Sequence, residues 1–304
     1  MDSQGLAAPQ GGTVRALLTA MRPHQWTKNL LVFAGLVFAV RMFDLPSVLL
    51  AAAGFVAFCA ASSACYLLND VLDAEADRSH PAKCRRPVAS GEMSTRMALA
   101  AAGLLASGAA GLSLALGLPF AAVVGGYLVL QIAYSTFLKH EVILDVLCIS
   151  ASFLLRAYGG CVVIDVKITH WLLICAGLLA LFLALAKRRH ELLQVEDAVS
   201  HRRSLAEYSP QMLDQMIAVV TASTLVAYIL YTVWPETVTK FGTDKLLLTV
   251  PFVLYGLFRY LYLVYSKEEG GCPSRHLLTD KPLLVDIVLY AAVAVWIITC
   301  GKGR

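Results

Sequence analysis

The sequence predicts an all-α polytopic membrane protein, with about nine transmembrane helices around a cytoplasm-facing cavity. Composition is the first reason: 58% of the 304 residues are hydrophobic and 15% are charged, whereas soluble domains carry about a quarter charged residues. The second reason is that apolar runs near the roughly 20 residues needed to cross a bilayer recur along the chain. The third is that the polar, motif-like loops all fall on one side of the membrane when those runs are taken as spans.

Residues 1–25 are expected to form an N-terminal tail and an interfacial helix, ahead of a single intramembrane domain at 26–304. The start of the chain is rich in Gly, Ala, Pro and Gln, which is typical of a loose tail. Thr13 is placed to cap a short helix with one apolar and one polar face, a pattern that favours the membrane interface. The apolar face holds Val14, Leu17, Leu18 and Met21, and the polar face holds Arg15, Thr19 and Arg22.

The first of the nine spans is weak, because its strongest apolar run, Leu30–Val40, covers only 11 residues. Trp26 and Lys28 are expected to anchor its entry at the membrane surface. The clearer spans are Leu45–Leu68, Met97–Gly117, Pro119–Leu138, Val142–Ile164, Thr169–Ala186, Met212–Trp234, Leu246–Tyr265 and Leu283–Cys300.

The distribution of Lys and Arg predicts the orientation, because cytoplasmic loops carry an excess of these residues. With the N-terminus in the cytoplasm, seventeen Lys and Arg residues fall in cytoplasmic segments and six fall outside. The remaining two, Arg156 and Arg259, lie within spans. The loops after the second, fourth and sixth spans then share the cytoplasmic side.

Cysteine usage and net charge argue against disulfide-rich, zinc-binding and nucleic-acid-binding proteins. The eight cysteines include no CxxC pair, so neither a disulfide framework nor a zinc site is expected. A formal charge of +4 is modest for a chain of this length, and we expect a membrane and no nucleic acid among its partners.

The stretch Asn69–Asp77 carries three carboxylates at helical spacing after the second span. If the helix continues, Asp70, Asp73 and Asp77 share one face, with Asn69 at its edge. Unpaired carboxylates are costly near lipid, and Mg²⁺ typically takes roughly one or two carboxylates together with substrate phosphate oxygens. We interpret the stripe as a metal–diphosphate site, with a solvated helix end as the alternative.

Two basic groups suggest phosphate binding, because Lys and Arg form charge-assisted hydrogen bonds with phosphate and Arg does so in bidentate fashion. The first group is Lys83, Arg85 and Arg86, after the carboxylates. The second is Lys187 and Arg188 at the end of the sixth span, followed by the acidic candidate Glu191. For the second group, a topology signal with lipid-headgroup contact is the alternative.

One basic residue, Arg156, lies well inside the fifth span, where a charge needs a partner or a wet cavity. Asp145 lies 11 residues earlier, about three turns away on the same helix face. A structural ion pair between Arg156 and another span is the alternative to a functional role.

Four features of the chain resemble the UbiA-type intramembrane prenyltransferase superfamily. They are Asn69-Asp70-x-x-Asp73-x-x-x-Asp77, the Arg-Pro-x-Ala-x-Gly run at Arg86–Gly91, Tyr134-x-x-x-x-Lys139, and the nine spans. Most members carry a second Asp-rich motif after the sixth span, where this chain has Lys187-Arg188-Arg189-His190-Glu191. With the segments 147–157 and 204–208, that replacement is similar to the decaprenyl-phosphate phosphoribosyltransferase branch.

The resemblance implies that residues 26–304 form a transferase domain. The implied reaction joins phosphoribosyl pyrophosphate to a polyprenyl (decaprenyl-type) phosphate, giving polyprenyl-phosphoryl-5-phosphoribose and pyrophosphate for arabinan-type cell-envelope glycan synthesis. It implies Mg²⁺ as cofactor and a bacterial plasma membrane with the active site facing the cytoplasm, and it leaves a homo-oligomer open. Asp70, Asp73 and Asp77 would be catalytic and metal-binding, and the substrate-binding candidates are Asn69, Lys83, Arg85, Arg86, Tyr134, Lys139, Arg156, Lys187, Arg188 and Glu191.

Two other functions stay open. One is an ordinary prenyltransferase that joins a polyprenyl diphosphate to an aromatic acceptor, with Glu191, Glu196 and Asp197 as a degenerate second metal site. The other is a non-enzymatic lipid or ion carrier, in which the carboxylate stripe would only bind its ligand.

Overall fold

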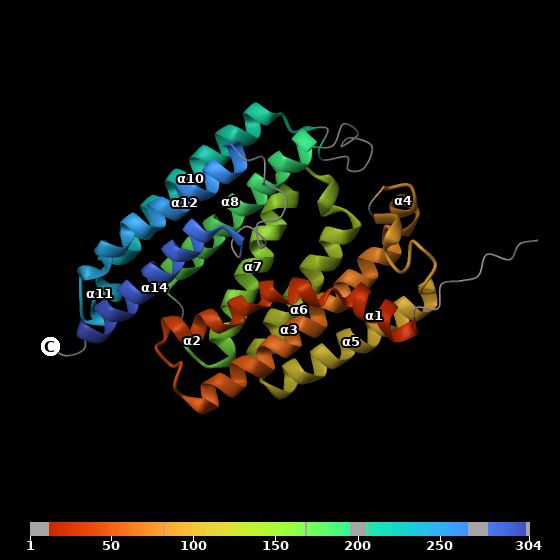
Figure 1. Ribbon diagram of the computed structural model, residues 1–304. Helices are drawn as coiled ribbons and strands as arrows, with labels where there is room; N and C mark the ends of the chain where they lie inside the picture. Colours follow the sequence, from red (N-terminus) through yellow and green to blue (C-terminus); the bar gives the residue numbers. More distant parts are fainter. Residues whose placement is uncertain are drawn as a thin grey trace, which may run out of the picture. The chain divides into compact units, whose positions relative to one another are not determined.

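Every element in the described part of the chain is helical (Figure 1). The computed structural model describes residues 12–81, 83–167, 169–194, 205, 207–266 and 279–301. The prediction of an all-α fold is therefore confirmed. Most of the predicted tail, and Glu196 and Asp197 of the alternative metal site, lie outside the described residues.

Seven helices in these ranges are long and apolar enough to cross a membrane. They span Leu45–Leu72, Thr95–Ala115, Leu118–Thr136, Leu144–Val163, Pro210–Val233, Lys245–Ser266 and Lys281–Thr299. The polytopic prediction is confirmed, while the count of nine stays a prediction.

The chain folds as two compact units: Met1–Lys139 with Leu155–Lys167, and His140–Leu154 with Ile168–Arg304. The first unit contains α1 (Thr13–Met21), η1 (Pro23–Phe33), α2 (Ala34–Phe38), α3 (Leu45–Leu72), α4 (Ala74–Arg78), η2 (Lys83–Arg85), α5 (Thr95–Ala115) and α6 (Leu118–Thr136). A short 3-10 turn, η3 (Leu138–His140), and α7 (Leu144–Val163) contain residues of both units.

Helix α3 is the centre of the first unit, and α5 runs beside it (Figure 1). Side-chain caps fix where both helices begin: Asp44 accepts a hydrogen bond from the Ser47 amide, and Ser94 accepts one from the Met97 amide. The ring of Phe58 on α3 packs edge-on against Phe120 and Tyr127 of α6, at centroid distances of 5.9 and 5.5 Å. These three rings lie in the main hydrophobic core of the unit.

The predicted first span is not a single helix. Residues Leu30–Val40 fall in the 3-10 segment η1, in α2, which has only five residues, and in the turn that follows it. Asn29 explains part of this difference, because its buried amide donates to Cys59 Sγ and Ser62 Oγ of α3, each at 3.2 Å. The segment also packs closely on α7, where a Cβ added to Gly160 would lie 1.9 Å from the Val32 carbonyl oxygen. The η1 segment is therefore held by polar contacts and by this close backbone approach, and not by a continuous apolar helix.

The second unit contains α8 (His170–Gln194), α10 (Pro210–Val233), α11 (Pro235–Phe241), η5 (Lys245–Thr249), α12 (Val250–Ser266) and α14 (Lys281–Gly301). Helix α8 lies beside α10, and α12 lies beside α14 (Figure 1). The core of the second unit includes Phe182 on α8 and Tyr260 on α12, whose ring centroids are 5.4 Å apart. Arg259, which was expected to lie within a span, is on α12 and pairs with Asp280 at 2.8 Å.

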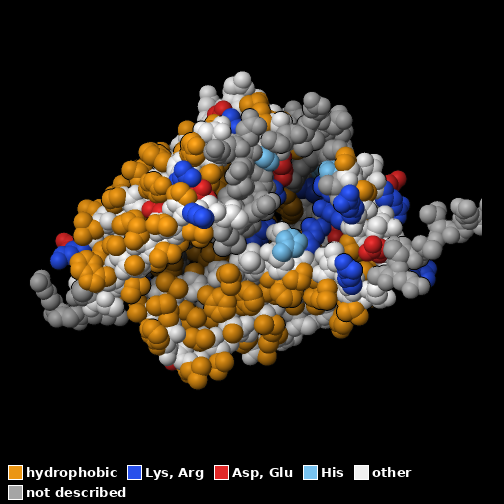
Figure 2. Space-filling view, in the orientation of Figure 1, with side chains coloured by type: hydrophobic (Ala, Val, Ile, Leu, Met, Phe, Trp, Pro, Cys, Tyr) orange, Lys and Arg blue, Asp and Glu red, His pale blue; other side chains and the backbone are white. Residues whose placement is uncertain are grey.

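Large apolar side chains cover much of the face shown in Figure 2, while Lys and Arg side chains gather near α4. The exposed apolar residues include Leu99, Leu104 and Leu114 on α5, Val219 and Val226 on α10, and Phe258 on α12. Such extensive apolar exposure on long helices suits contact with lipid and does not suit water.

Candidate functional site

The three motif carboxylates lie where α3 passes into α4. Asp70 is in the last turn of α3, Asp73 lies between the two helices, and Asp77 is in α4. The Asp73 amide donates to the Asn69 carbonyl at 2.9 Å, and the Asp77 amide donates to the Asp73 carbonyl at 2.8 Å. The helical hydrogen-bond spacing therefore continues through a short break at Asp73, so the predicted spacing is largely retained.

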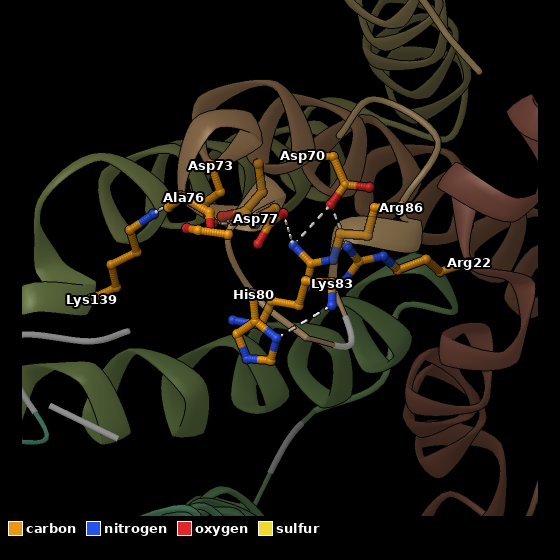
Figure 3. A network of polar contacts seen from close by, with 11 residues as sticks. Arg22, Asp70, Asp73, Ala76, Asp77, His80, Lys83, Arg86 and Lys139 are labelled. Carbon is orange, nitrogen blue, oxygen red and sulfur yellow. Dashed lines mark hydrogen bonds and ion pairs between the residues drawn. The ribbon is translucent and has the colours of Figure 1, made fainter. Parts of the chain in front are cut away.

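Each of these carboxylates has a basic partner (Figure 3). Arg22 forms an ion pair with Asp70, and Arg86 lies 3.3 Å from the same Asp70 oxygen. Arg86 also pairs with Asp77 at 2.5 Å, and Lys139 pairs with Asp73 at 2.6 Å. The premise that these carboxylates are unpaired is wrong, because the nearby Arg86 and the sequence-distant Arg22 and Lys139 compensate their charge.

Arg22 reaches this cluster from the junction of α1 and η1. Its backbone is in the left-handed conformation, with φ 54° and ψ 62°, and it ends α1. The guanidinium also lies 5.1 Å from the centre of the Tyr66 ring. The sequence placed Arg22 on the polar face of an interfacial helix and did not identify it as a site residue. A basic residue just before the first span is a common topology signal, so nothing in the sequence singled it out.

One oxygen of the cluster is suited to a metal ion. Asp70 is 1% exposed, and both of its basic partners contact Oδ1, while the buried Oδ2 has no hydrogen-bond partner. Within the described residues, no three His, Cys, Asp or Glu side chains are grouped closely enough to hold a metal ion by themselves. Mg²⁺ usually needs only roughly one or two carboxylates when substrate phosphates complete its shell. The donor set therefore fits a magnesium–diphosphate group and does not fit a metal site made entirely of protein ligands.

Of the other loop candidates, Lys139 and Asn69 contact the cluster directly. Lys139 brings the end of the Tyr134–Lys139 segment to Asp73, and Asn69 donates to Asp73 Oδ2 at 2.9 Å. Tyr134 is half-buried near the end of α6. Lys83 begins η2, and its amide donates to His80 Nδ1 at 3.3 Å (Figure 3). Arg85, at the end of η2, is exposed.

Arg156 is buried in the first unit, with 2% of its surface exposed. Its Nε donates to Asn29 Oδ1 at 2.7 Å, and its Nη2 donates to the Tyr127 hydroxyl at 2.8 Å. The guanidinium carbon lies 4.7 Å from the centre of the same tyrosine ring. Arg156 thus links α7 to η1 and α6. Neither Asn29 nor Tyr127 was predicted, although the rule that a buried charge needs partners signalled that such residues exist.

The second unit contains the basic cluster at the end of α8. Arg188 is 2% exposed, and its Nε donates to Asp145 Oδ2 at 2.6 Å. Its Nη1 forms an ion pair with Glu191. Lys187 differs: its side chain is 44% exposed, and its Nζ lies 3.6 Å from Glu191 Oε1. Adjacent basic residues in the sequence therefore have different surroundings, one buried in the unit and one at its surface.

Tyr208 completes this cluster from the segment before α10. Its hydroxyl donates to Asp145 Oδ1 at 2.8 Å and accepts a hydrogen bond from the Ile143 amide at 2.7 Å. Burial, and then the hydrogen bond to Asp145, raise the pKa of the Tyr208 hydroxyl, so it remains a proton donor to the carboxylate. Neither Asp145 nor Tyr208 was among the predicted site residues, although Tyr208 lies in the segment 204–208 that carries the resemblance to the phosphoribosyltransferase branch, and Asp145 lies two residues before the segment 147–157.

Comparison with known proteins agrees with this architecture. Residues 29–279 match the UbiA prenyltransferase family. The chain is 37% identical over 314 residues to the decaprenyl-phosphate phosphoribosyltransferase of Mycolicibacterium smegmatis, covering 99% of this chain and 96% of that protein. It is 34% identical over 286 residues to the protein of the same name from Corynebacterium glutamicum, covering 91% and 85% of the two chains.

Among solved structures, a UbiA homolog from Archaeoglobus fulgidus bound to DMAPP and Mg²⁺ superposes with a TM-score of 0.71. The superposition covers 93% of this chain and 99% of the homolog. Because the two sequences are only 18% identical, this likeness concerns the fold alone. The predicted resemblance to the superfamily and to its phosphoribosyltransferase branch is confirmed. By this match over most of its length, the chain belongs to the UbiA prenyltransferase family.

Proposed function

We propose that this protein transfers 5-phosphoribose from phosphoribosyl pyrophosphate to a polyprenyl phosphate of the decaprenyl type and releases pyrophosphate. One observation carries the proposal: relatives that are 34% and 37% identical over most of both chains bear the name of that activity. The product, polyprenyl-phosphoryl-5-phosphoribose, would serve cell-envelope glycan synthesis of the arabinan type. The protein would act in a bacterial plasma membrane.

The carboxylate cluster is proposed to hold the sugar diphosphate together with Mg²⁺. Asp70, Asp73 and Asp77 would provide the metal ligands, and the ion would neutralise charge on the departing pyrophosphate. Arg22 and Arg86 support this assignment, because both lie against the carboxylates and can bind phosphate oxygens in bidentate fashion. A site that contains both signs of charge is suited to a metal–phosphate group, since the carboxylates bind the metal and the arginines bind the phosphate.

The chemistry requires positioning more than it requires a base. A phosphate monoester is already anionic at neutral pH, with a second pKa of about 6. Its oxygen can form the new bond at the anomeric carbon as the bond from that carbon to pyrophosphate breaks, and the electron pair leaves with pyrophosphate. Lys187, at the surface of the second unit, is proposed to contact a phosphate monoester, from either the sugar or the lipid. No residue is required to remove a proton from the nucleophile.

An assay on membranes separates this function from its alternatives. Membranes that contain the protein should transfer label from phosphoribosyl pyrophosphate into a lipid when polyprenyl phosphate and Mg²⁺ are added. They should not join a labelled prenyl diphosphate to an aromatic acid. The reverse pattern would establish the aromatic prenyltransferase, and binding without any product would establish a carrier.

The orientation is proposed to place the N-terminus and the carboxylate cluster in the cytoplasm. A cysteine at Ser79, an exposed position just after α4, tests this once the native cysteines are replaced. In intact cells it should resist an impermeant thiol reagent, because the reagent reaches only the outer face. A cysteine at Asp244, in a loop predicted to be external, is the matched control and should react. Labelling at Ser79 with protection at Asp244 would reverse the topology.

A further inference from the structure

The cluster around Arg188 assigns different roles to two neighbouring cations. Asp145 is 0% exposed and Arg188 is 2% exposed. The pair joins the start of α7 to the end of α8, and Tyr208 joins both to the segment before α10 through its hydrogen bond to Asp145. Because the Arg188 guanidinium is buried, a bound anion reaches it only if the surrounding side chains move, and separating the buried pair with Asp145 would leave an uncompensated charge.

Two cations compete for the single carboxylate of Glu191. Lys187 lies four residues before Glu191 and Arg188 lies three residues before it, so both spacings favour an ion pair on a helix. Both cations pair with Glu191 through different oxygens, and Arg188 makes the closer contact, from its Nη1 to Oε2. Lys187 Nζ stays 3.6 Å from Oε1, beyond hydrogen-bonding distance, on a side chain that is 44% exposed.

We infer that Asp145, Arg188 and Tyr208 are a positioning network that engages Glu191 and so keeps the Lys187 ammonium available to a phosphate group. Arg188 acts through Glu191 and does not itself contact the phosphate. The planar guanidinium of Arg188 makes this possible, because its several N–H donors can bind Asp145 through Nε and Glu191 through Nη1 at the same time. Without the second contact, Glu191 closes on Lys187 and masks its charge. This inference rests on the proposed function for the identity of the phosphate substrate.

Arg188→Lys is the sharpest variant, because it keeps a cation beside the buried Asp145 while removing the fork that reaches Glu191. We expect the KM of the affected phosphate substrate to rise roughly tenfold with little change in kcat, the size expected when a charge-assisted contact is lost. Adding Glu191→Gln should restore KM to within about twofold of the wild type, since the competing charge is then absent. Separate KM values for phosphoribosyl pyrophosphate and polyprenyl phosphate identify which phosphate Lys187 meets.

Lys187→Gln is the matched control: its KM should rise by a similar factor, and Glu191→Gln should not restore it. A KM that stays raised in Arg188→Lys/Glu191→Gln would show that Arg188 touches the phosphate and would overturn the inference. An unchanged KM in Arg188→Lys would also overturn it, because the network would then be structural only. If Arg188→Lys does not fold, the pair Asp145→Asn/Arg188→Gln, which keeps a buried hydrogen bond without charge, takes its place with the same expectations.

Thermal stabilisation of each purified variant by inorganic phosphate provides a readout that does not depend on turnover. Stabilisation should weaken in Arg188→Lys and return with Glu191→Gln. If the wild-type protein makes no phosphoribosyl lipid, the proposed function is overturned. The thermal stabilisation of the variants by inorganic phosphate would still decide the role of Arg188. Phosphate stabilisation that is equal in all variants would contradict the network.

Discussion

Asp73→Asn is expected to lower phosphoribosyl transfer roughly 10²–10³-fold, the loss typical when one preorganised charge-stabilising group is removed from an active site. Asp73 is the best of the three carboxylates for this test, because its side chain is 29% exposed and that of Asp70 is 1% exposed. The asparagine oxygen can still accept the hydrogen bond from Asn69. The substitution therefore removes charge from the cluster and takes the ion pair from Lys139, whose side chain is 13% exposed. Turnover at saturating Mg²⁺, measured beside thermal stability in detergent, is the appropriate comparison.

Glu75→Gln is the matched control for that change. Glu75 lies on α4 between Asp73 and Asp77, and it is exposed. Loss of the same charge two residues away should leave turnover near the wild-type level, because this carboxylate is outside the cluster. Near-normal turnover of Asp73→Asn at saturating Mg²⁺ would remove Asp73 from the catalytic group, and equal losses in both variants would indicate a general electrostatic effect.

Gly160→Ala is expected to destabilise the protein severely or to prevent its accumulation. The added Cβ would lie 1.9 Å from the Val32 carbonyl oxygen and 2.6 Å from the carbonyl carbon, both of which are backbone atoms. Relief requires η1 to move away from α7, and that movement would disturb the hydrogen bond between Arg156 and Asn29. Overpacking typically costs about 1–3 kcal/mol, and a clash with backbone this close should exceed that range.

Gly125→Ala in α6 controls for the loss of a helical glycine. A Cβ there has nothing within 4 Å, and alanine favours a helix over glycine by roughly 1 kcal/mol. Thermal unfolding in detergent should show a lower Tm for Gly160→Ala and an equal or higher Tm for Gly125→Ala. An unchanged Tm in Gly160→Ala would mean that η1 does not depend on this close approach.

Hydropathy located most helices because lipid-exposed and buried positions are both apolar. The predicted span Met97–Gly117 corresponds to α5, and Met212–Trp234 corresponds to α10, each within two residues at both ends. Hydropathy placed the end of the sixth span at Ala186, whereas α8 continues to Gln194. The charged residues from Lys187 onward end the apolar run but do not end the helix. Lys, Arg, Glu, Leu and Gln all favour a helix, and the pairs of Glu191 with Lys187 and Arg188 stabilise it.

The carboxylates of the site were predictable because they lie within one short stretch of sequence. The ion pairs that they form were not, since Arg22 lies 48 residues before Asp70 and Lys139, itself a predicted candidate, lies 66 residues after Asp73. Sequence spacing identifies neighbours on one helix, while contacts between helices depend on packing that a single sequence does not display. The same limit applies to Lys187 and Arg188, whose adjacency suggested a shared role until the fold placed one at the surface and buried the other.

The most direct test of the central claim is the mass of the lipid that the purified protein makes from polyprenyl phosphate, Mg²⁺ and phosphoribosyl pyrophosphate labelled with carbon-13 in the ribose ring. The proposed function predicts a lipid that has gained the whole labelled phosphoribose, with one pyrophosphate released for each lipid formed. A lipid without carbon-13, or pyrophosphate released only when a prenyl diphosphate and an aromatic acid are supplied, would contradict it.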